Sequence, residues 1–132
     1  MIMYGHDGRP YDEGDGFYEQ LNALGQRCRD VAVSKGFDDA WKKEKVDRYL
    51  LLIVSEACEA QNDLRDGHSP NEVWTEKDKD GLDKPCGFPI ECADILIRVA
   101  HLMAAHEIDV TEMVRMKLAY NAQRPTKHGR QF

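Results

Sequence analysis

The sequence predicts an all-α domain, because apolar residues recur at helical spacing in four segments and no strand pattern is strong enough to predict a sheet. A length of 132 residues fits one domain. Residues 1–15 are rich in glycine, aspartate and proline, so we expect an irregular lead-in without an assigned role. Residues 16–132 are expected to form a single helical domain.

Two helices are predicted in the first half of the chain. Apolar residues at helical spacing run from Phe17 to Ser34, just before Gly36. The second helix is expected to begin near Asp38 or Asp39, either of which can cap it, and to end at about residue 65, before a glycine. Its apolar stripe predicts a largely buried face.

Two more helices are predicted after a long polar connection over residues 66–88, which glycine and proline interrupt. The third helix is expected to begin near Pro89, a favourable first helical residue, and to end at about residue 106. The fourth is expected over residues 109–121. Asp109, followed three residues later by Glu112, resembles a capping box at its start.

Composition restricts the classes of partner and compartment. A formal net charge of −6 disfavours binding to a nucleic-acid polymer or to an anionic membrane. No stretch approaches the roughly 20 apolar residues of a membrane span. The four cysteines show no Cys-x-x-Cys pair, so we expect reduced thiols in a cytoplasmic protein.

Two acidic pairs carry most of the functional information. Glu56 and Glu59 follow an apolar run on the second predicted helix, and Glu91 and Asp94 precede one on the third. Residues three apart lie on one helix face, so each helix points two carboxylates in one direction from apolar surroundings. Burying unpaired carboxylates costs several kcal/mol per ion. A cation between the pairs removes this cost, and carboxylate oxygens are the ligands that Mg²⁺ prefers.

Each acidic pair also has a simpler interpretation. A single Glu-x-x-Glu is common on solvated helix surfaces, and Asp94 could pair with Arg98 one turn later. Two matched pairs in the two most apolar helices favour the metal over this alternative. The histidines at 101 and 106 are five residues apart and do not share a helix face, so zinc is not predicted.

Four carboxylates on two packed helices could hold one or two Mg²⁺ ions, bind phosphate oxygens and activate a water. A carboxylate that is not fully used as a ligand could accept a proton from that water. This chemistry suits hydrolysis of a phosphoanhydride. Lys117, Asn121 and Arg124 suit phosphate recognition, although the basic end could also be a solvated tail. Further basic residues in that tail are Lys127, His128 and Arg130.

Three segments resemble the MazG-like family of all-α nucleoside triphosphate pyrophosphohydrolases. They are Ser55–Ala60, which contains Glu-x-x-Glu, then Lys84–Asp94, which contains Lys-Pro-x-Gly and Glu-x-x-Asp, and Lys117–Gly129, which contains Tyr-Asn-x-x-Arg-Pro-x-x-His-Gly. The resemblance extends over roughly residues 45–129. Many relatives carry an acidic residue directly before the first motif glutamate, where this chain has Ser55.

The resemblance implies a bundle of four to five helices that assembles into a homodimer or homotetramer. It also implies Mg²⁺-dependent cleavage of a (deoxy)nucleoside triphosphate between the α and β phosphates, which yields the monophosphate and pyrophosphate. The Mg²⁺ ligands it implies are Glu56, Glu59, Glu91 and Asp94. One of the first two glutamates would be the base. Lys117 and Asn121 match positions that contact phosphate or sugar, with assistance from Arg124.

Two other functions remain open from the sequence. The chain could be a non-catalytic nucleotide- or metal-binding regulatory module, or a purely structural bundle that dimerises through the same helices. Only the first of these predicts that Mg²⁺ raises thermal stability, because a ligand that binds the folded state alone must stabilise it.

Overall fold

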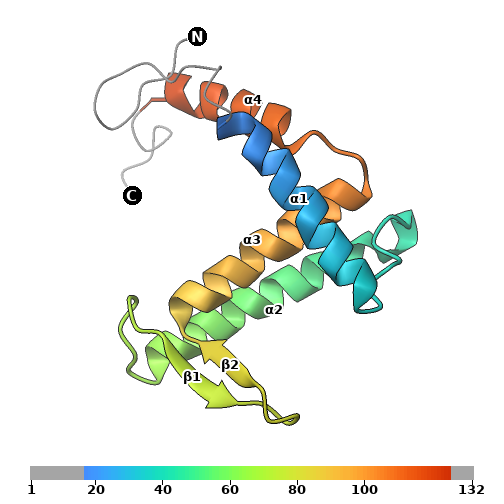
Figure 1. Cartoon of the computed structure of the whole chain (residues 1–132). Coiled ribbons are helices and arrows are strands. Elements are labelled where there is room, and N and C mark those ends of the chain that lie inside the picture. Colours follow the sequence, from blue (N-terminus) through green and yellow to red (C-terminus); the bar gives the residue numbers. More distant parts are fainter. Residues whose placement is uncertain (1–16, 126–132) are drawn as a thin grey trace.

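The computed structural model describes residues 17–125, which form four α-helices and one small hairpin (Figure 1). The elements in chain order are α1 (Phe17–Ser34), the 3-10 helix η1 (Lys43–Lys45), α2 (Val46–Arg65), β1 (Trp74–Lys77), β2 (Asp83–Cys86), α3 (Phe88–Ala105) and α4 (Val110–Gln123). The predicted N-terminal lead-in and the basic tail after residue 125 lie outside the described residues.

The pair formed by α2 and α3 is the centre of the molecule. The two helices lie antiparallel and side by side, α1 packs across α3, and α4 packs against α1 (Figure 1). Gly25 lies where α1 crosses α3 closely. A Cβ at this position would lie 3.3 Å from the carbonyl oxygen of Ala100, so the close approach favours glycine. Asn22 joins α1 to the start of α4, because its side chain donates to Asp109 and accepts from the backbone N–H of Val110.

The helices predicted from spacing agree with the structure at three positions. Helix α1 has the predicted bounds, and α3 begins and ends one residue earlier than predicted. The N-cap prediction for α4 is confirmed, since Asp109 accepts a hydrogen bond of 3.0 Å from the backbone N–H of Glu112.

The predicted start of the second helix near residue 38 or 39 is wrong. A turn and η1 occupy residues 40–45, and α2 begins at Val46. The reason is tertiary. Ala40 is 1% exposed and packs with Tyr49 and Ala105, while the Tyr49 hydroxyl donates to the Asp39 carboxylate. The turn before α2 allows Ala40 to pack against Tyr49 and Ala105.

The predicted all-α content needs one correction, because residues 74–86 form an antiparallel hairpin. Its register pairs Trp74 with Cys86 at the open end, and Lys77 with Asp83 next to the turn. The last pair also forms an ion pair of 2.5 Å. Beside the hairpin, His68 stacks on Trp74 with ring centroids 3.9 Å apart. The connection after α2 is therefore an ordered element that leads directly into α3.

Gly87 connects this hairpin to α3. Its φ of 122° lies in the region that favours glycine, and a Cβ there would overlap the carbonyl oxygen of Glu72. Its own carbonyl accepts the backbone N–H of Glu91 at 3.0 Å. The close approach at Gly87 thus fixes the first turn of α3, in which Glu91 lies.

Large apolar side chains remain uncovered on the helices. Apart from Tyr49, the buried apolar residues within 17–125 are alanines and cysteines, and no large side chain there falls below 2% exposure. On α2, Leu50, Leu51 and Val54 are 47%, 68% and 56% exposed, and on α3 Leu96 is 65% exposed. Leu50 and Val54 are four residues apart and therefore lie on one face of α2, so this face of the helix carries exposed apolar side chains.

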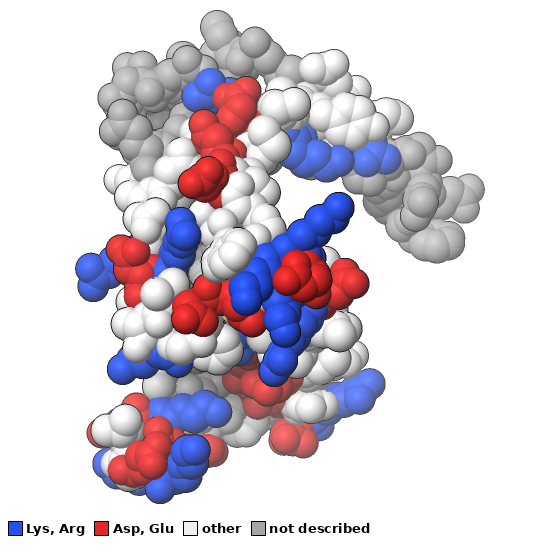
Figure 2. All heavy atoms as spheres, turned by 90° about the vertical axis from the view of Figure 1, so that its right-hand side faces the viewer, with Lys and Arg blue, Asp and Glu red and all other residues white. Residues whose placement is uncertain are grey.

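The charged surface is mixed rather than of a single sign. On the face shown in Figure 2, acidic and basic side chains lie next to one another. No helix among the described residues combines the length and the apolar character needed to cross a membrane.

We predict that Gly87→Ala destabilises the protein more than Gly81→Ala. Both glycines have positive φ, 122° and 80°, so both variants bear backbone strain of about 1–3 kcal/mol. At Gly81 a Cβ meets nothing within 4 Å, whereas at Gly87 it collides with the backbone of Glu72. Urea unfolding followed by circular dichroism measures the difference. Equal losses in the two variants would show that the close approach is unimportant.

Candidate functional site

Three carboxylates converge between α2 and α3. Glu56 and Glu59 lie one turn apart on α2, and Glu91 lies in the first turn of α3. One ligand oxygen from each of the three lies within 4.8 Å of the others. Glu56 and Glu91 are buried, at 6% and 8% exposure, and Glu59 is exposed. The antiparallel pairing of two amphipathic helices therefore concentrates negative charge at one buried point.

Arg98 supplies a positive charge to this cluster. Its Nε donates to Oε1 of Glu56 at 2.6 Å, across the interface between α3 and α2. The sequence alternative paired Arg98 with Asp94 on the same helix, but this ion pair joins the two helices instead. The Glu56 side chain is 8% exposed and that of Arg98 is 32% exposed.

Glu91 has no comparable partner. Its Oε2 is buried and makes no hydrogen bond with the described residues. Burial raises the pKa of Glu91 to about 7, with further contributions from the neighbouring Glu56 carboxyl, which shares a hydrogen bond with protonated Glu91, and from the negative charge of Glu59. An uncompensated buried acceptor beside two other carboxylates is a suitable ligand for a hard cation.

Asp94, the fourth predicted ligand, is not part of this group of oxygen atoms. It is half-buried, and its pKa is raised first by burial and then by the negative charge of Glu56. The nearby Arg98 opposes this shift. Asp94 therefore lies within electrostatic reach of the cluster, but on the side that faces a neighbouring cavity.

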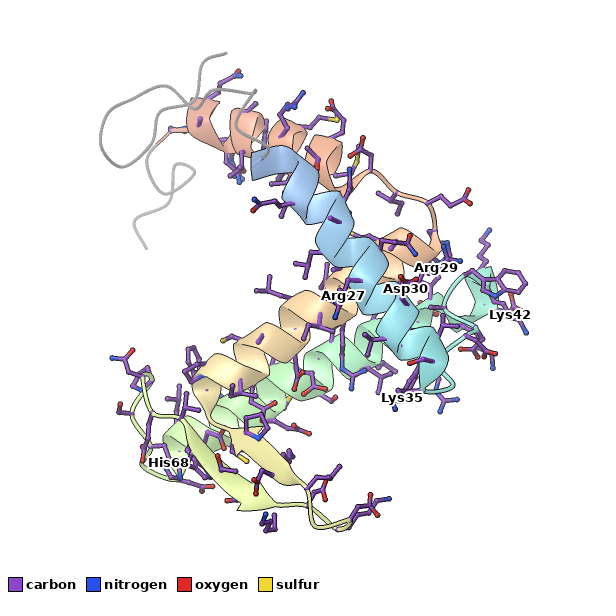
Figure 3. All side chains as sticks on the ribbon, in the orientation of Figure 1. Arg27, Arg29, Asp30, Lys35, Lys42 and His68 are labelled. Atoms are coloured by element: carbon purple, nitrogen blue, oxygen red, sulfur yellow. The ribbon has the colours of Figure 1, made fainter. Side chains whose placement is uncertain are left out.

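That cavity has a volume of about 460 Å³ and lies among α1, the start of α2, and α3. Its apolar wall includes Leu24, Val31 and Ile97. Its polar lining includes Arg27 of α1 and Lys35, which directly follows α1, and both are labelled in Figure 3. The remaining residues that line it are Cys28, Ala32, Phe37, Tyr49, Asp94, Arg98 and His101. Pockets of this size and mainly apolar lining commonly hold small organic ligands.

His101 is a polar group in this cavity that the sequence analysis considered only for zinc. It is 6% exposed, and its Nε2 makes no hydrogen bond with the described residues. Burial lowers the pKa of His101, and the charges of Arg29 and Arg98 lower it further, which favours the neutral ring. The ring packs edge-on against Tyr49, with centroids 5.6 Å apart. A neutral imidazole in a cavity can donate or accept one hydrogen bond.

Asp63 is a further carboxylate near the cluster. It follows Glu59 by one turn on α2, and its buried Oδ2 makes no hydrogen bond with the described residues. Its charge and that of Glu91 both contribute to the raised pKa of Cys86, after burial and the charge of Glu76. Helical spacing puts Asp63 on the face of Glu56 and Glu59, so the sequence contained a signal for it.

The predicted phosphate-binding residues are not brought to the acidic cluster within one chain. Lys117, Asn121 and Arg124 lie on α4 or at its end, where Lys117 and Arg124 flank the ring of Tyr120 at 4.8 Å and 5.4 Å from its centroid. Within residues 17–125, α4 contacts α1 and α3 but not α2. In Figure 1, α4 lies at the opposite end of the molecule from the hairpin that precedes α3.

Comparison with known proteins gives no relative. No family model, no curated protein and no solved structure matches the chain.

We predict that Glu91 contributes a loss of stability to the metal-free protein as pH rises from 4.5 to about 7, whereas His101, whose pKa is lowered, contributes in the opposite direction. The folded-state pKa of Glu91 is raised to about 7 from 4.5, so in this range folding takes up a proton, and the stability falls until Glu91 is ionised. Glu91→Gln removes the titrating group and should flatten the slope. Urea unfolding with a chelator, at a series of pH values from about 4.5 to 7, measures the slope. An identical slope in the variant would assign the dependence to another group.

Proposed function

We propose that this protein is a Mg²⁺-dependent nucleotide pyrophosphohydrolase that cleaves a (deoxy)nucleoside triphosphate between the α and β phosphates. The observation that carries the proposal is the convergence of Glu56, Glu59 and Glu91 within 4.8 Å, with a buried oxygen of Glu91 that lacks a donor. Such an all-carboxylate set suits Mg²⁺, which commonly binds protein carboxylates together with substrate phosphates. The resemblance of residues 45–129 to the MazG-like family adds the specific reaction.

In this proposal Glu56, Glu59 and Glu91 hold the metal, and Asp94 completes the set from the cavity side. Bound Mg²⁺ offsets the negative charge that develops on the phosphates and lowers the pKa of a coordinated water. We assign Glu59 as the base that accepts the proton of the attacking water. Glu56 is buried, whereas Glu59 is exposed and has a carboxylate oxygen accessible to solvent.

The adjoining cavity suits the nucleoside part of the substrate. Asp94 and Arg98 line the cavity, and Arg98 also contacts Glu56 of the acidic cluster, so the two features are neighbours. The volume of about 460 Å³ is within the range of small-ligand pockets. A base can pack on the apolar wall and hydrogen-bond to the unpartnered Nε2 of His101.

We further propose that the active form is a homodimer or homotetramer. Lys117, Asn121 and Arg124 lie on a helix that does not contact α2, so a second copy is needed to bring such residues to a cluster. The exposed apolar side chains of α2 offer a surface for this contact. Burying them in an interface would release roughly 25 cal/mol for each Å² of apolar surface.

The decisive experiment measures pyrophosphate release from a panel of ordinary and modified nucleoside triphosphates. We expect release with Mg²⁺, with monophosphate as the co-product, and none with a chelator, because the carboxylates alone cannot stabilise an anionic transition state. Absence of release while Mg²⁺ raises the melting temperature would replace the proposal with a non-catalytic nucleotide- or metal-binding regulatory module.

Glu59→Gln and Asp47→Asn form a matched pair for this assay. Both remove one exposed carboxylate from α2, but Asp47 lies in the first turn, away from the cluster. Loss of the base is expected to lower turnover roughly 10²–10⁴-fold in Glu59→Gln, with unchanged helical content. Asp47→Asn should keep turnover near that of the wild type. Full activity in Glu59→Gln would contradict the assignment of this site.

Leu51→Glu is expected to dissociate the oligomer, because it places a charge in the proposed α2 interface. Leu82→Glu is the control, since the two leucines are 68% and 66% exposed but Leu82 lies at the end of the hairpin. Sedimentation velocity measures the assembly state. Loss of assembly in both variants, or in neither, would argue against an interface on this face of α2.

A further inference from the structure

Arg98 differs from an ordinary interhelical ion-pair partner in what surrounds it. It lies one turn after Asp94 on α3, and its Nε reaches Oε1 of Glu56 at 2.6 Å. Glu56 is itself one of the three converging carboxylates. The guanidinium therefore occupies a side of the carboxylate cluster, where its positive charge takes the role that a bound cation would otherwise have.

The two partners of this pair are unequally buried. The Glu56 side chain is 8% exposed and needs a cation beside it, because an unpaired buried carboxylate is strongly unfavourable. The Arg98 side chain is 32% exposed and also lines the cavity of about 460 Å³. Arg98 can consequently leave Glu56 and remain solvated, whereas Glu56 cannot lose Arg98 without another cation.

The cavity into which Arg98 can turn suits an anion. Two further cationic residues, Arg27 and Lys35, line it, and Asp94 is the carboxylate among its lining residues (Figure 3). A guanidinium has a planar fork of donors that matches two oxygens of a phosphate, so an arginine here could hold a polyphosphate chain.

We propose that Arg98 occupies the position of the metal's positive charge while the metal is absent. It pairs with Glu56 in the metal-free protein, gives way when a divalent cation binds the cluster, and then turns into the cavity to contact the phosphates of the substrate. This inference rests on the proposed metal site, and it adds a residue that couples metal binding to substrate binding. It requires that Arg98 and the divalent cation compete for Glu56.

The competition can be measured without substrate. Mn²⁺, which shares the preference of Mg²⁺ for carboxylate ligands, is titrated into chelator-treated protein, and free Mn²⁺ is followed by electron paramagnetic resonance. Arg98→Gln removes the competitor and is expected to bind Mn²⁺ roughly tenfold more tightly than the wild type. Arg27→Gln removes the same charge from an exposed position in the same cavity and should change the affinity by no more than about threefold.

The direction in which Arg98→Gln changes the Mn²⁺ affinity decides whether Arg98 competes with the metal. If Arg98 instead orients Glu56 toward the metal, Arg98→Gln binds Mn²⁺ more weakly, and an equal or weaker affinity overturns the proposal. Should neither the wild type nor Arg98→Gln bind Mn²⁺, the metal site of the proposed function fails and the inference fails with it. Circular dichroism checks the fold, and Arg98→Lys, which keeps the charge but loses the Nε donor, repeats the test if Arg98→Gln unfolds. Its affinity is expected between those of the wild type and Arg98→Gln.

A steady-state experiment then tests the second role of Arg98. With saturating Mg²⁺, Arg98→Gln is expected to raise KM for the triphosphate roughly tenfold or more, although its metal site is filled more readily. Arg98→Lys should recover part of this loss. An unchanged KM and kcat in Arg98→Gln would exclude contact with the substrate.

Discussion

The concentration of negative charge between α2 and α3 is the constraint on which the candidate site depends. Three carboxylates lie within 4.8 Å of one another, and two of them are buried. An ion pair and a protonation reduce this negative charge. Arg98 neutralises Glu56, and Glu91, whose pKa is raised to about 7, keeps its proton at lower pH. Both interactions can be reversed, because the Arg98 side chain is 32% exposed to solvent and Glu91 can lose its proton. A helix pair that only needed stability would place apolar residues at these positions.

The same helix pair explains why the site and the outer surface are linked. The residues buried among α1, α2 and α3 include the small side chains of Ala60, Ala100 and Ala105, which allow helices to approach closely. Other apolar residues of α2, namely Leu50, Leu51 and Val54, are exposed. Since α2 also carries Glu56 and Glu59, an interface on its apolar face would constrain the position of the carboxylates. Assembly and metal binding would then share one structural element.

Sequence patterns predicted the parts of the fold that local chemistry determines. Helical spacing located α1, and the side chain of Asp109 located the start of α4. The hairpin was missed because its strands have four residues each, carry alternating charges and include Pro85, so no apolar alternation marks them. The late start of α2 accompanies the packing of Ala40 against Tyr49 and Ala105, and Ala105 belongs to α3, so helical spacing within one segment cannot contain this contact. The four acidic positions could be identified from the sequence, but not which of them converge.

Arg98 shows the same limit at the candidate site. On one helix, the spacing of four residues makes Asp94 the expected partner. The partner is Glu56 instead, 42 residues away, because α3 packs against α2 with the guanidinium at the interface. An arginine that spans two helices at a cluster of carboxylates responds to any change in the charge of that cluster. A pair within one helix would remain on its own surface whatever occupied the site. Under the proposed function, this tertiary pairing would allow Arg98 to couple metal binding at the carboxylates to the adjoining cavity.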